Sequence, residues 1–338
     1  MRGIHLIVPA LFLAGCQAGQ EPAASEDVLA SFAPLPAVME SEANPMTPAR
    51  VDLGRMLFYD ARFSAGGDIS CYVCHPLHDY GTSHRRTGVG HEGLMGPRND
   101  PTVYNAAGHV AQFWDGRSPD VEDQALGPVL NPVEMAMPDG DAVVALLRSI
   151  PGYREAFAAA FPEAAEPVTF ENFGRAIGAF ERGLTTPSRW DLYLHGEPDA
   201  LTSAEVDGLE VFMQKGCVAC HGGAYVGGQA YYKVGLVHAW PDRSDAGRFE
   251  ATGDPADSLV FKVPSLRNVA ETWPYFHDGS VQRLPEAVAL MAWHQSGLEL
   301  APGEVDAIVT WLKSLTGVLD LDYIRKPELP PGPESALE

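Results

Sequence analysis

The pentapeptides CYVCH at 71–75 and CVACH at 217–221 share the pattern Cys-x-x-Cys-His, and the rest of the chain is organised around them. In each pentapeptide two thiols lie about one helical turn apart, and an imidazole follows directly. Two such thiols can add to the vinyl groups of a haem while the imidazole reaches its iron. The pattern therefore predicts two covalently attached c-type haems, with His75 and His221 as their proximal ligands.

The cysteine count supports this interpretation. The chain has five cysteines, namely Cys16, Cys71, Cys74, Cys217 and Cys220, so the two pairs account for every cysteine after the N-terminal segment. A redox dithiol would not need two copies with a histidine at the same place. A zinc site would require both pairs to meet as one four-cysteine cluster and would leave the histidines unexplained.

The N-terminal segment has the features of an export signal. Arg2 is followed by an apolar run, residues 4–13, that is too short to span a bilayer. Small residues then precede Cys16, as in a bacterial lipoprotein signal whose cysteine becomes the lipidated first residue. An ordinary signal that happens to contain a cysteine is the alternative. We expect a periplasmic protein whose only membrane contact is a lipid on Cys16, and Gln17 favours the outer membrane.

The formal net charge of −22 limits the kinds of partner. Nucleic acid is excluded, because its phosphates require a basic face. The acidic balance fits a partner protein with a basic docking patch, or it serves only solubility.

A weak internal repeat surrounds the two haem motifs. LGRMLF (53–58) precedes the first motif and GLEVF (208–212) precedes the second, each with apolar residues at helical spacing. Further helical patterns cover about 141–160, 169–183 and 302–316. The sequence thus predicts a mainly α fold with two cytochrome-c-like domains, each carrying one haem.

Composition divides the chain into five parts. The turn-rich stretch TTPSR at 185–189 indicates the domain boundary. The expected parts are a signal peptide (1–16), a flexible tether (17–45), an N-terminal haem domain (46–184), a C-terminal haem domain (185–322) and an extended tail (323–338).

The second axial ligand of each iron determines what that haem does. Methionine raises the reduction potential and favours electron transfer, whereas an open or displaceable position allows reaction with peroxide. After His221 the chain has one methionine, Met291, and its competitors are His238, His277 and His294. After His75 the candidates are His78, His84, His91 and His109, and their positions in the sequence do not distinguish among them.

In these stretches the chain resembles the bacterial di-haem cytochrome c peroxidases, over about residues 50–320. The resemblance is carried, in order, by LGRMLFYDARFS, GVGH, GPRNDPTVYNAA, QFWDGR, EDQALGP and NPVEM around the first haem motif. After the second haem motif it continues with GGQAYY, FKVPSLRNVAETWPYFHDG and LPEAVALM. It implies a peroxidatic haem of low potential in the N-terminal domain and an electron-transferring haem of high potential in the C-terminal domain.

The resemblance also implies roles for single residues. His91, in GVGH, matches the displaceable distal ligand of the peroxidatic haem, and Met291 matches the ligand of the high-potential haem. Gln124 and Glu134 match residues that line the peroxide pocket, with Glu122 as the nearest rival of Glu134.

Two further features between the domains are implied by the same resemblance. Trp114, in QFWDGR, matches a tryptophan that lies between the haems as an electron conduit. A calcium ion is implied as well, bound by the Asn99 side chain and by the carbonyls of Thr272 and Pro274.

The expected function is that of a cytochrome c peroxidase, which reduces hydrogen peroxide to water with electrons from a small cytochrome c or a copper protein. Members of this family are often homodimers. One alternative is a MauG-type enzyme that oxidises a partner protein, although that enzyme has Tyr where Met291 stands and lacks a histidine like His91. The other alternative is a di-haem electron carrier with two permanently six-coordinate irons.

Overall fold

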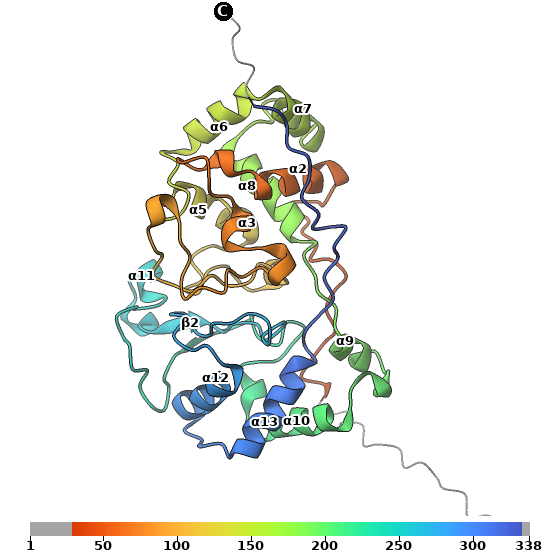
Figure 1. The fold of residues 1–338 in the computed structure, drawn as a ribbon, viewed down its shortest axis with the longest axis vertical. Helices are drawn as coiled ribbons and strands as arrows, with labels where there is room; N and C mark the ends of the chain where they lie inside the picture. Colours follow the sequence, from red (N-terminus) through yellow and green to blue (C-terminus); the bar gives the residue numbers. More distant parts are fainter. Residues whose placement is uncertain (1–28, 333–338) are drawn as a thin grey trace, which may run out of the picture.

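The computed structural model describes residues 29–332, which form two helical lobes stacked along the long axis (Figure 1). The N-terminal lobe contains α2 (Pro48–Tyr59), α3 (Cys71–Cys74), α4 (Val121–Gln124), α5 (Leu126–Leu130), α6 (Gly140–Ser149), α7 (Pro151–Ala160) and α8 (Phe170–Glu181). The C-terminal lobe contains α9 (Arg189–Leu194), α10 (Ser203–Gln214), β1 (Tyr231–Lys233), α11 (Phe249–Thr252), β2 (Val260–Lys262), α12 (Leu284–Met291) and α13 (Pro302–Lys313).

Short 3-10 turns connect these elements, namely η1 (Ala61–Phe63), η2 (Leu77–Asp79), η3 (His91–Gly93), η4 (Ala106–Gly108), η5 (Pro198–Ala200), η6 (Cys217–Ala219) and η7 (Pro255–Asp257). A π-helical turn, η8 (Ala292–Ser296), directly follows α12. Strands β1 and β2 pair antiparallel and form the only sheet within residues 29–332. The prediction of a mainly α fold is therefore confirmed.

The weak sequence repeat corresponds to a helix pair that recurs in both lobes. Helix α2 precedes the first haem motif and crosses α8, and α10 precedes the second motif and crosses α13. A Cβ on Gly54 would lie 1.9 Å from the carbonyl oxygen of Ala176, and one on Gly208 would lie 2.1 Å from that of Ala307. Only glycine lets the two backbones approach this closely. The repeat thus reflects two similar structural units, each with its own haem motif.

The helical pattern predicted at about 141–160 is confirmed, and it corresponds to two helices, α6 and α7. Pro151 begins α7, and Ile150 before it has an extended backbone (φ −104°, ψ 106°). Proline has no N–H to donate and disfavours a helical conformation in the residue before it. The helix expected at about 169–183 is confirmed as α8, while the one expected at 302–316 ends earlier, at Lys313.

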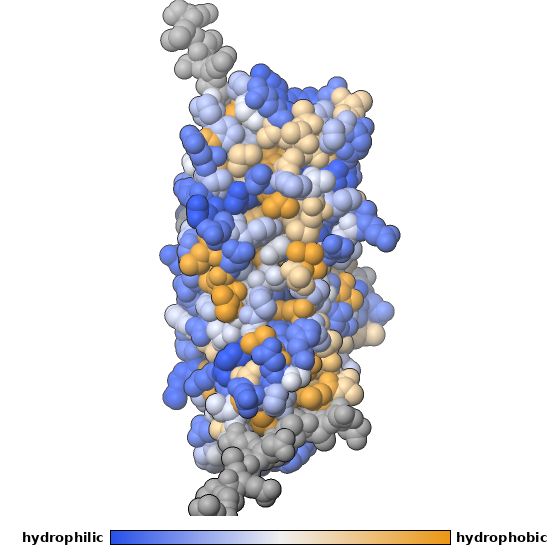
Figure 2. All heavy atoms as spheres, turned by 90° about the vertical axis from the view of Figure 1, so that its right-hand side faces the viewer, coloured by the Kyte–Doolittle hydropathy of each residue, from blue (hydrophilic) through white to orange (hydrophobic). Residues whose placement is uncertain are grey.

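Both terminal segments cross to the opposite lobe along one side of the molecule (Figure 1). Phe32 is buried in the core of the C-terminal lobe, with its ring 5.2 Å from that of Trp190 and 6.0 Å from that of Trp311. Ile324 is fully buried in the core of the N-terminal lobe, where its carbonyl accepts a hydrogen bond from the Tyr59 hydroxyl. On that side apolar residues are dispersed among polar ones (Figure 2).

These contacts correct two expectations about the ends of the chain. Residues 29–45 pack on the lobes, so this part of the segment expected to be a tether is an element of the fold. The tail expected to begin at residue 323 likewise begins with core residues. The signal peptide, Cys16 and the first part of the tether lie outside the described residues. Within residues 29–332 no helix combines the length and the apolar character needed to cross a membrane.

Candidate functional site

The cysteines of the two pentapeptides form no disulfide with each other or with another cysteine of residues 29–332. Cys71 and Cys74 lie in the single turn of α3, and Cys217 and Cys220 lie at η6. Burial raises the pKa of each thiol, to about 12 for Cys74 and about 11 for Cys217, so the thiols are neutral. Such thiols are poor redox nucleophiles, and within residues 29–332 no three metal-binding side chains form a cluster. The donor set fits covalent haem attachment.

The histidine of each pentapeptide meets one requirement of an iron ligand. His75 has a suitable orientation, and His221 has a neutral ring. His75 Nδ1 donates to the Gly81 carbonyl at 3.0 Å, which leaves Nε2 for the iron. Burial lowers the pKa of His221 to about 4, so its imidazole is neutral. Gly227 makes room for the chain here, since a Cβ on it would lie 2.3 Å from the Pro264 carbonyl oxygen and 3.2 Å from His221 Nδ1.

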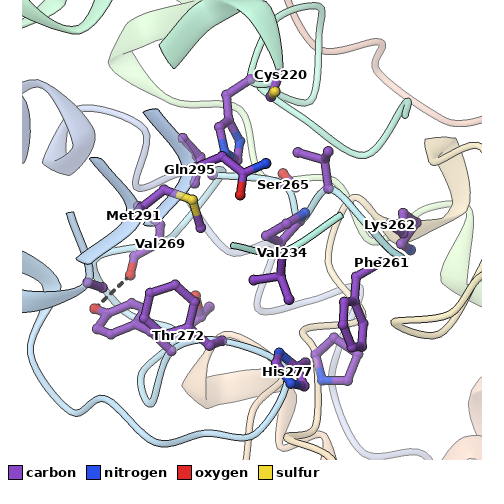
Figure 3. Close-up of a pocket in the computed structure, with 18 of the residues that line it drawn as sticks. Cys220, Val234, Phe261, Lys262, Ser265, Val269, Thr272, His277, Met291 and Gln295 are labelled. Carbon is purple, nitrogen blue, oxygen red and sulfur yellow. Dashed lines mark hydrogen bonds between the residues drawn. The ribbon is translucent and has the colours of Figure 1, made fainter. Parts of the chain in front are cut away.

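A cavity of about 290 Å³ in the C-terminal lobe has the dimensions and chemistry of a cofactor site. Its wall is mostly apolar and includes Cys217, Cys220 and His221. Met291, the last residue of α12, also lines this cavity, and its side chain points into it (Figure 3). Residues of both lobes line the cavity, which therefore extends to the boundary between them.

The three histidines that compete with Met291 have other contacts. His294 Nδ1 donates to the His238 carbonyl at 2.8 Å, and the ring of His238 stacks on an indole at 3.9 Å. His277 lines the cavity, but its ring stacks on that of Phe261 at 4.2 Å. Figure 3 shows this pair at the end of the cavity opposite to the haem-motif cysteine. Met291 is the candidate whose position fits a ligand best.

His91 lies in a surface loop next to the backbone of Glu134. It begins η3, and its N–H donates to the Glu134 carbonyl at 2.8 Å. Gly90 allows this approach, because a Cβ there would lie 2.1 Å from the Val133 carbonyl oxygen. The His91 side chain is 26% exposed, and its Nε2 lies 4.0 Å from the Glu92 carboxylate, too far for a hydrogen bond. The backbone of His91 is thus anchored to Glu134, whereas no hydrogen bond within residues 29–332 holds its imidazole.

Two of the other histidines that follow the first haem motif are accounted for by their surroundings. His84 Nδ1 donates to the Trp273 carbonyl at 2.9 Å, its ring stacks on that indole at 4.2 Å, and its Nε2 lies 3.0 Å from Asp79. His78 is exposed on η2. His109 lies at the lobe boundary, where it lines the cavity described above.

Glu134 is half-buried and electrostatically close to the first haem motif. Burial raises the pKa of its carboxyl group, although His75 and a hydrogen bond from the Asn131 side chain at 2.8 Å act to lower it. Its charge in turn acts to raise the pKa of the Cys71 and Cys74 thiols. A carboxyl group with a raised pKa beside a haem can accept a proton and return it.

Glu122, the rival of Glu134, is a structural ion-pair partner. Its carboxylate accepts two hydrogen bonds from Arg182, at 2.7 and 2.8 Å, and one from Asn44 at 2.8 Å. Burial acts to raise its pKa, but these bonds lower it below the usual value, so Glu122 stays ionised. Gln124 ends α4, is half-buried, and has a side-chain amide without a hydrogen-bond partner in residues 29–332.

Trp114 connects the two lobes. Its indole N–H donates to the Asn99 carbonyl at 2.9 Å, and its own carbonyl accepts from the backbone N–H of Lys262 at 2.7 Å. Its ring is edge-on to that of His277, 6.4 Å away, and Trp114 lines the same cavity as Met291.

The three residues of the implied calcium site also line this cavity. Asn99 donates its side-chain N–H groups to the carbonyls of Arg85 and Arg86, at 3.1 and 3.2 Å. The side-chain oxygen of Asn99 is thereby left without a hydrogen-bond donor among the described residues. Thr272 and Pro274 contribute to the same wall. Uncharged oxygens of this kind suit a hard cation.

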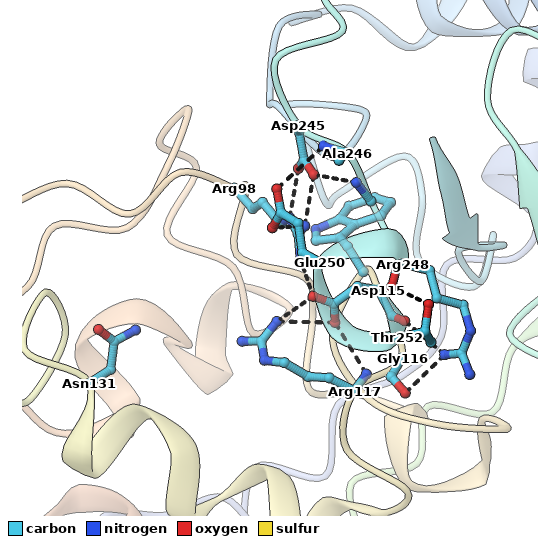
Figure 4. Close-up of polar contacts among 12 residues, drawn as sticks. Arg98, Asp115, Gly116, Arg117, Asn131, Asp245, Ala246, Arg248, Glu250 and Thr252 are labelled. Carbon is cyan, nitrogen blue, oxygen red and sulfur yellow. Dashed lines mark hydrogen bonds and ion pairs between the residues drawn. The ribbon is translucent and has the colours of Figure 1, made fainter. Parts of the chain in front are cut away.

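A network of ion pairs next to Trp114 was not foreseen from the sequence (Figure 4). Arg98 contacts Asp115 at 2.5 Å in its own lobe, and Asp245 at 2.6 Å and Glu250 at 3.0 Å in the C-terminal lobe. Arg98 and Asp245 are 147 residues apart, so no local pattern could have indicated the pair. The network joins the lobes beside the tryptophan and Asn99.

Two family models match successive parts of the chain, and the first extends past the N-terminal lobe into α9. The model described as di-haem cytochrome c peroxidase matches residues 48–199, and the model described as cytochrome c matches residues 205–316.

Several relatives match over most of the chain. The cytochrome c551 peroxidase of Pseudomonas aeruginosa is 46% identical over 88% of this chain and 88% of its own length. The cytochrome c551 peroxidase of Nitrosomonas europaea is 42% identical over 91% of this chain and 91% of its own length. The methylamine utilization protein MauG of Paracoccus denitrificans is 36% identical over 85% of this chain and 95% of its own.

Among solved structures, a MauG-like protein associated with microbial copper homeostasis matches with a TM-score of 0.77 and 32% identity, over 87% of this chain and 97% of its own. The two haem motifs, the two lobes and these similarities agree. The chain belongs to the di-haem cytochrome c peroxidase family and is a peroxidase with two c-type haems.

Proposed function

We propose that this enzyme reduces hydrogen peroxide to water with electrons from a small redox protein, either a cytochrome c or a copper protein. The observation that carries the proposal is the difference between the surroundings of Met291 and those of His91. Met291 ends a packed helix and points into the cavity, whereas His91 lies in a surface loop without a strong partner. When bound, the haems supply electron storage in the C-terminal lobe and peroxide reduction in the N-terminal lobe.

The residues of the N-terminal lobe then have distinct tasks. His91 would withdraw with its loop once the donor has delivered an electron, and its withdrawal would open the pocket to peroxide. The free amide of Gln124 orients the peroxide. Glu134 accepts a proton from one peroxide oxygen and returns it to the departing oxygen, which favours cleavage of the O–O bond. Two electrons and two protons per peroxide complete the conversion to two waters.

We extend the proposal to the lobe boundary. Trp114 would serve as the electron conduit, because it contacts residues of both lobes. Asn99, Thr272 and Pro274 would hold a calcium ion that keeps the boundary in its active arrangement. A spectrum of the half-reduced protein, recorded with and without calcium, tests this part. Calcium should change the absorption of the N-terminal haem if the ion controls the release of His91, and identical spectra would contradict this part of the proposal.

The cellular location is part of the same proposal. The apolar run and the small residues before Cys16 support export to the periplasm with a lipid on that cysteine. Radiolabelled palmitate should label the wild-type chain in its native host but not a Cys16→Ala variant. Homodimer formation, which is often found in the family, is tested by light scattering of the purified protein.

The decisive experiment for peroxide reduction is Glu134→Gln. We expect turnover with reduced donor to fall by about 10²–10⁴-fold, the usual contribution of general acid–base assistance, while both haems remain attached. Glu92→Gln is the matched control, because the Glu92 side chain is 78% exposed and adjoins His91. Unchanged turnover in the Glu134 variant would remove Glu134 from the mechanism.

Oxidation of a partner protein is the second candidate, favoured by the similarity to MauG and to the MauG-like structure. A redox titration separates the two candidates. Two well-separated potentials support peroxide reduction at one haem and electron storage at the other, whereas a tightly coupled pair supports protein oxidation.

A further inference from the structure

We propose that Lys262, positioned by His109, binds a propionate carboxylate of the C-terminal haem and raises the reduction potential of that haem. The proposal depends on the presence of the haem but not on peroxide reduction. Its failure and the failure of the proposed function can therefore be distinguished by measuring potentials and turnover separately.

Lys262 is a buried cation without a carboxylate partner. It is the last residue of β2, is 9% exposed and lines the cavity that contains His221 and Met291 (Figure 3). Its Nζ donates to the Ala111 carbonyl at 2.7 Å and lies 3.5 Å from His109 Nδ1. No ion pair involves Lys262 within residues 29–332. Since an ammonium has three donors, its hydrogen-bonding capacity is incompletely used.

The nearby acid does not neutralise Lys262. Asp115 acts electrostatically on Lys262, but its carboxylate is committed to Arg98 at 2.5 Å and to Arg117 at 2.9 Å. Burial lowers the pKa of the Lys262 ammonium to about 8, so its charge is retained at neutral pH. A buried charge of this kind is costly unless an anion accompanies it.

His109 provides a second observation that an acceptor belongs here. A lysine ammonium only donates, so the Nδ1 atom facing it must be the acceptor and the ring proton must lie on Nε2. His109 Nε2 is buried and has no hydrogen-bond partner. His109 also lines the cavity, with its ring held edge-on to that of Tyr225 at 5.5 Å. One N–H of the Lys262 ammonium and the Nε2–H of His109 thus remain without an acceptor among residues 29–332.

A haem c placed in this cavity would bring the missing anions. Its propionate carboxylates lie on the edge of the porphyrin away from the thioether bonds, and the cavity extends from the cysteines to Lys262 at the lobe boundary. The backbone N–H of Lys262 also donates to the Trp114 carbonyl. The carboxylate site therefore adjoins the tryptophan through which the two lobes contact each other. Reduction adds negative charge to the haem, so a nearby ammonium stabilises the reduced form.

The test is a redox titration of Lys262→Gln, with the reduction of each haem followed by its own absorption. We expect the equilibrium constant for reduction of the C-terminal haem to fall about tenfold or more, or about 59 mV for one electron. Lys233→Gln is the matched control, because Lys233 is an exposed lysine on β1 that lines the same cavity. Lys262→Arg, which keeps the charge, should restore most of the potential.

Three outcomes would overturn the proposal, namely an unchanged potential in Lys262→Gln, an equal shift in Lys233→Gln, or a shift confined to the N-terminal haem. If Lys262→Gln does not fold, redox-difference infrared spectra of the wild type and of Lys262→Arg decide the question. The propionate bands should differ between these two proteins, and identical bands would exclude a contact with residue 262.

Discussion

The two lobes use the same helix pair and the same Cys-x-x-Cys-His pattern, but the proposed second ligands of the two haems lie on different kinds of element. In the C-terminal lobe Met291 ends α12, which packs against α13. In the N-terminal lobe His91 lies in a loop whose neighbours Leu94 and Met95 are exposed. Moving a packed helix would disrupt a core, whereas moving a surface loop breaks few contacts. The difference in function that we propose therefore originates outside the haem motifs.

The charged groups of the lobes differ in the same sense. The N-terminal site has Glu134, a carboxyl group with a raised pKa that suits proton transfer. The C-terminal cavity has Lys262, a buried cation that suits the storage of an electron. One lobe thus has the chemistry for handling protons and the other the chemistry for holding charge.

The substitution that should reduce the difference between the two haems most is Met291→His. An imidazole in place of the thioether should lower the potential of the C-terminal haem by about 0.2 V, within the ~0.8 V range that axial ligands span. The donor should then no longer reduce the C-terminal haem, and the withdrawal of His91 that we propose should not follow. Spectroelectrochemical titration measures the potential, and Met95→His, at an exposed position, is the control. An unaltered potential would contradict the assignment of Met291.

The crossed terminal segments allow each lobe to be weakened from the far end of the chain. Phe32→Ala should destabilise the C-terminal lobe by about 3–5 kcal/mol and Ile324→Ala the N-terminal lobe by about 2–5 kcal/mol, because each leaves a cavity in a core. Denaturant unfolding, followed by the absorption of each haem, measures both effects. Leu321→Ala, at a position that is 60% exposed, should change stability by less than about 0.5 kcal/mol. Equal effects of all three substitutions would contradict the packing described here.

His91→Gly should remove the side chain that we propose keeps peroxide from the N-terminal haem. We expect the fully oxidised enzyme to react with peroxide without prior reduction, on the order of a hundredfold faster than the wild type if the open state is about 1% populated. Stopped-flow mixing with peroxide measures the rate. His78→Gly is a suitable control because His78 is exposed on η2. An oxidised His91 variant that stays inert would show that this histidine is not the gate.

Asn131→Ala should raise the pKa of the Glu134 carboxyl group further above its usual value. The Asn131 side chain donates to the Glu134 carboxylate and so lowers the pKa of that group. Without this bond the pKa of Glu134 should rise further, because the hydrogen bond stabilises the charged carboxylate. In a plot of kcat/KM against pH, the limb on the acid side should then move to higher pH. A limb that stays in place, or moves to lower pH, would exclude Glu134 as its origin.

Much of the fold and of the site was predictable because it depends on short stretches of chain. Covalent haem attachment needs two thiols and an imidazole within five consecutive residues, so the two haems and the two lobes could be predicted directly. The resemblance to a known family added His91, Glu134 and Met291, which the spacing of residues alone left among several candidates. The helical pattern at 141–160 likewise depended on local periodicity, and Pro151 divides it into two helices.

What the sequence by itself determined was the number of haems, their attachment and the mainly α architecture, since these follow from contiguous residues and local periodicity. Only the tertiary structure decided that Arg182 and Asn44 donate hydrogen bonds to the Glu122 carboxylate. It also decided that Arg98 forms an ion pair across the lobe boundary, and that Lys262 is buried without a carboxylate partner. It also decided that Phe32 and Ile324 fill the cores of opposite lobes. The physical reason is that burial and charge pairing depend on which distant segments pack together, and no local pattern encodes those contacts.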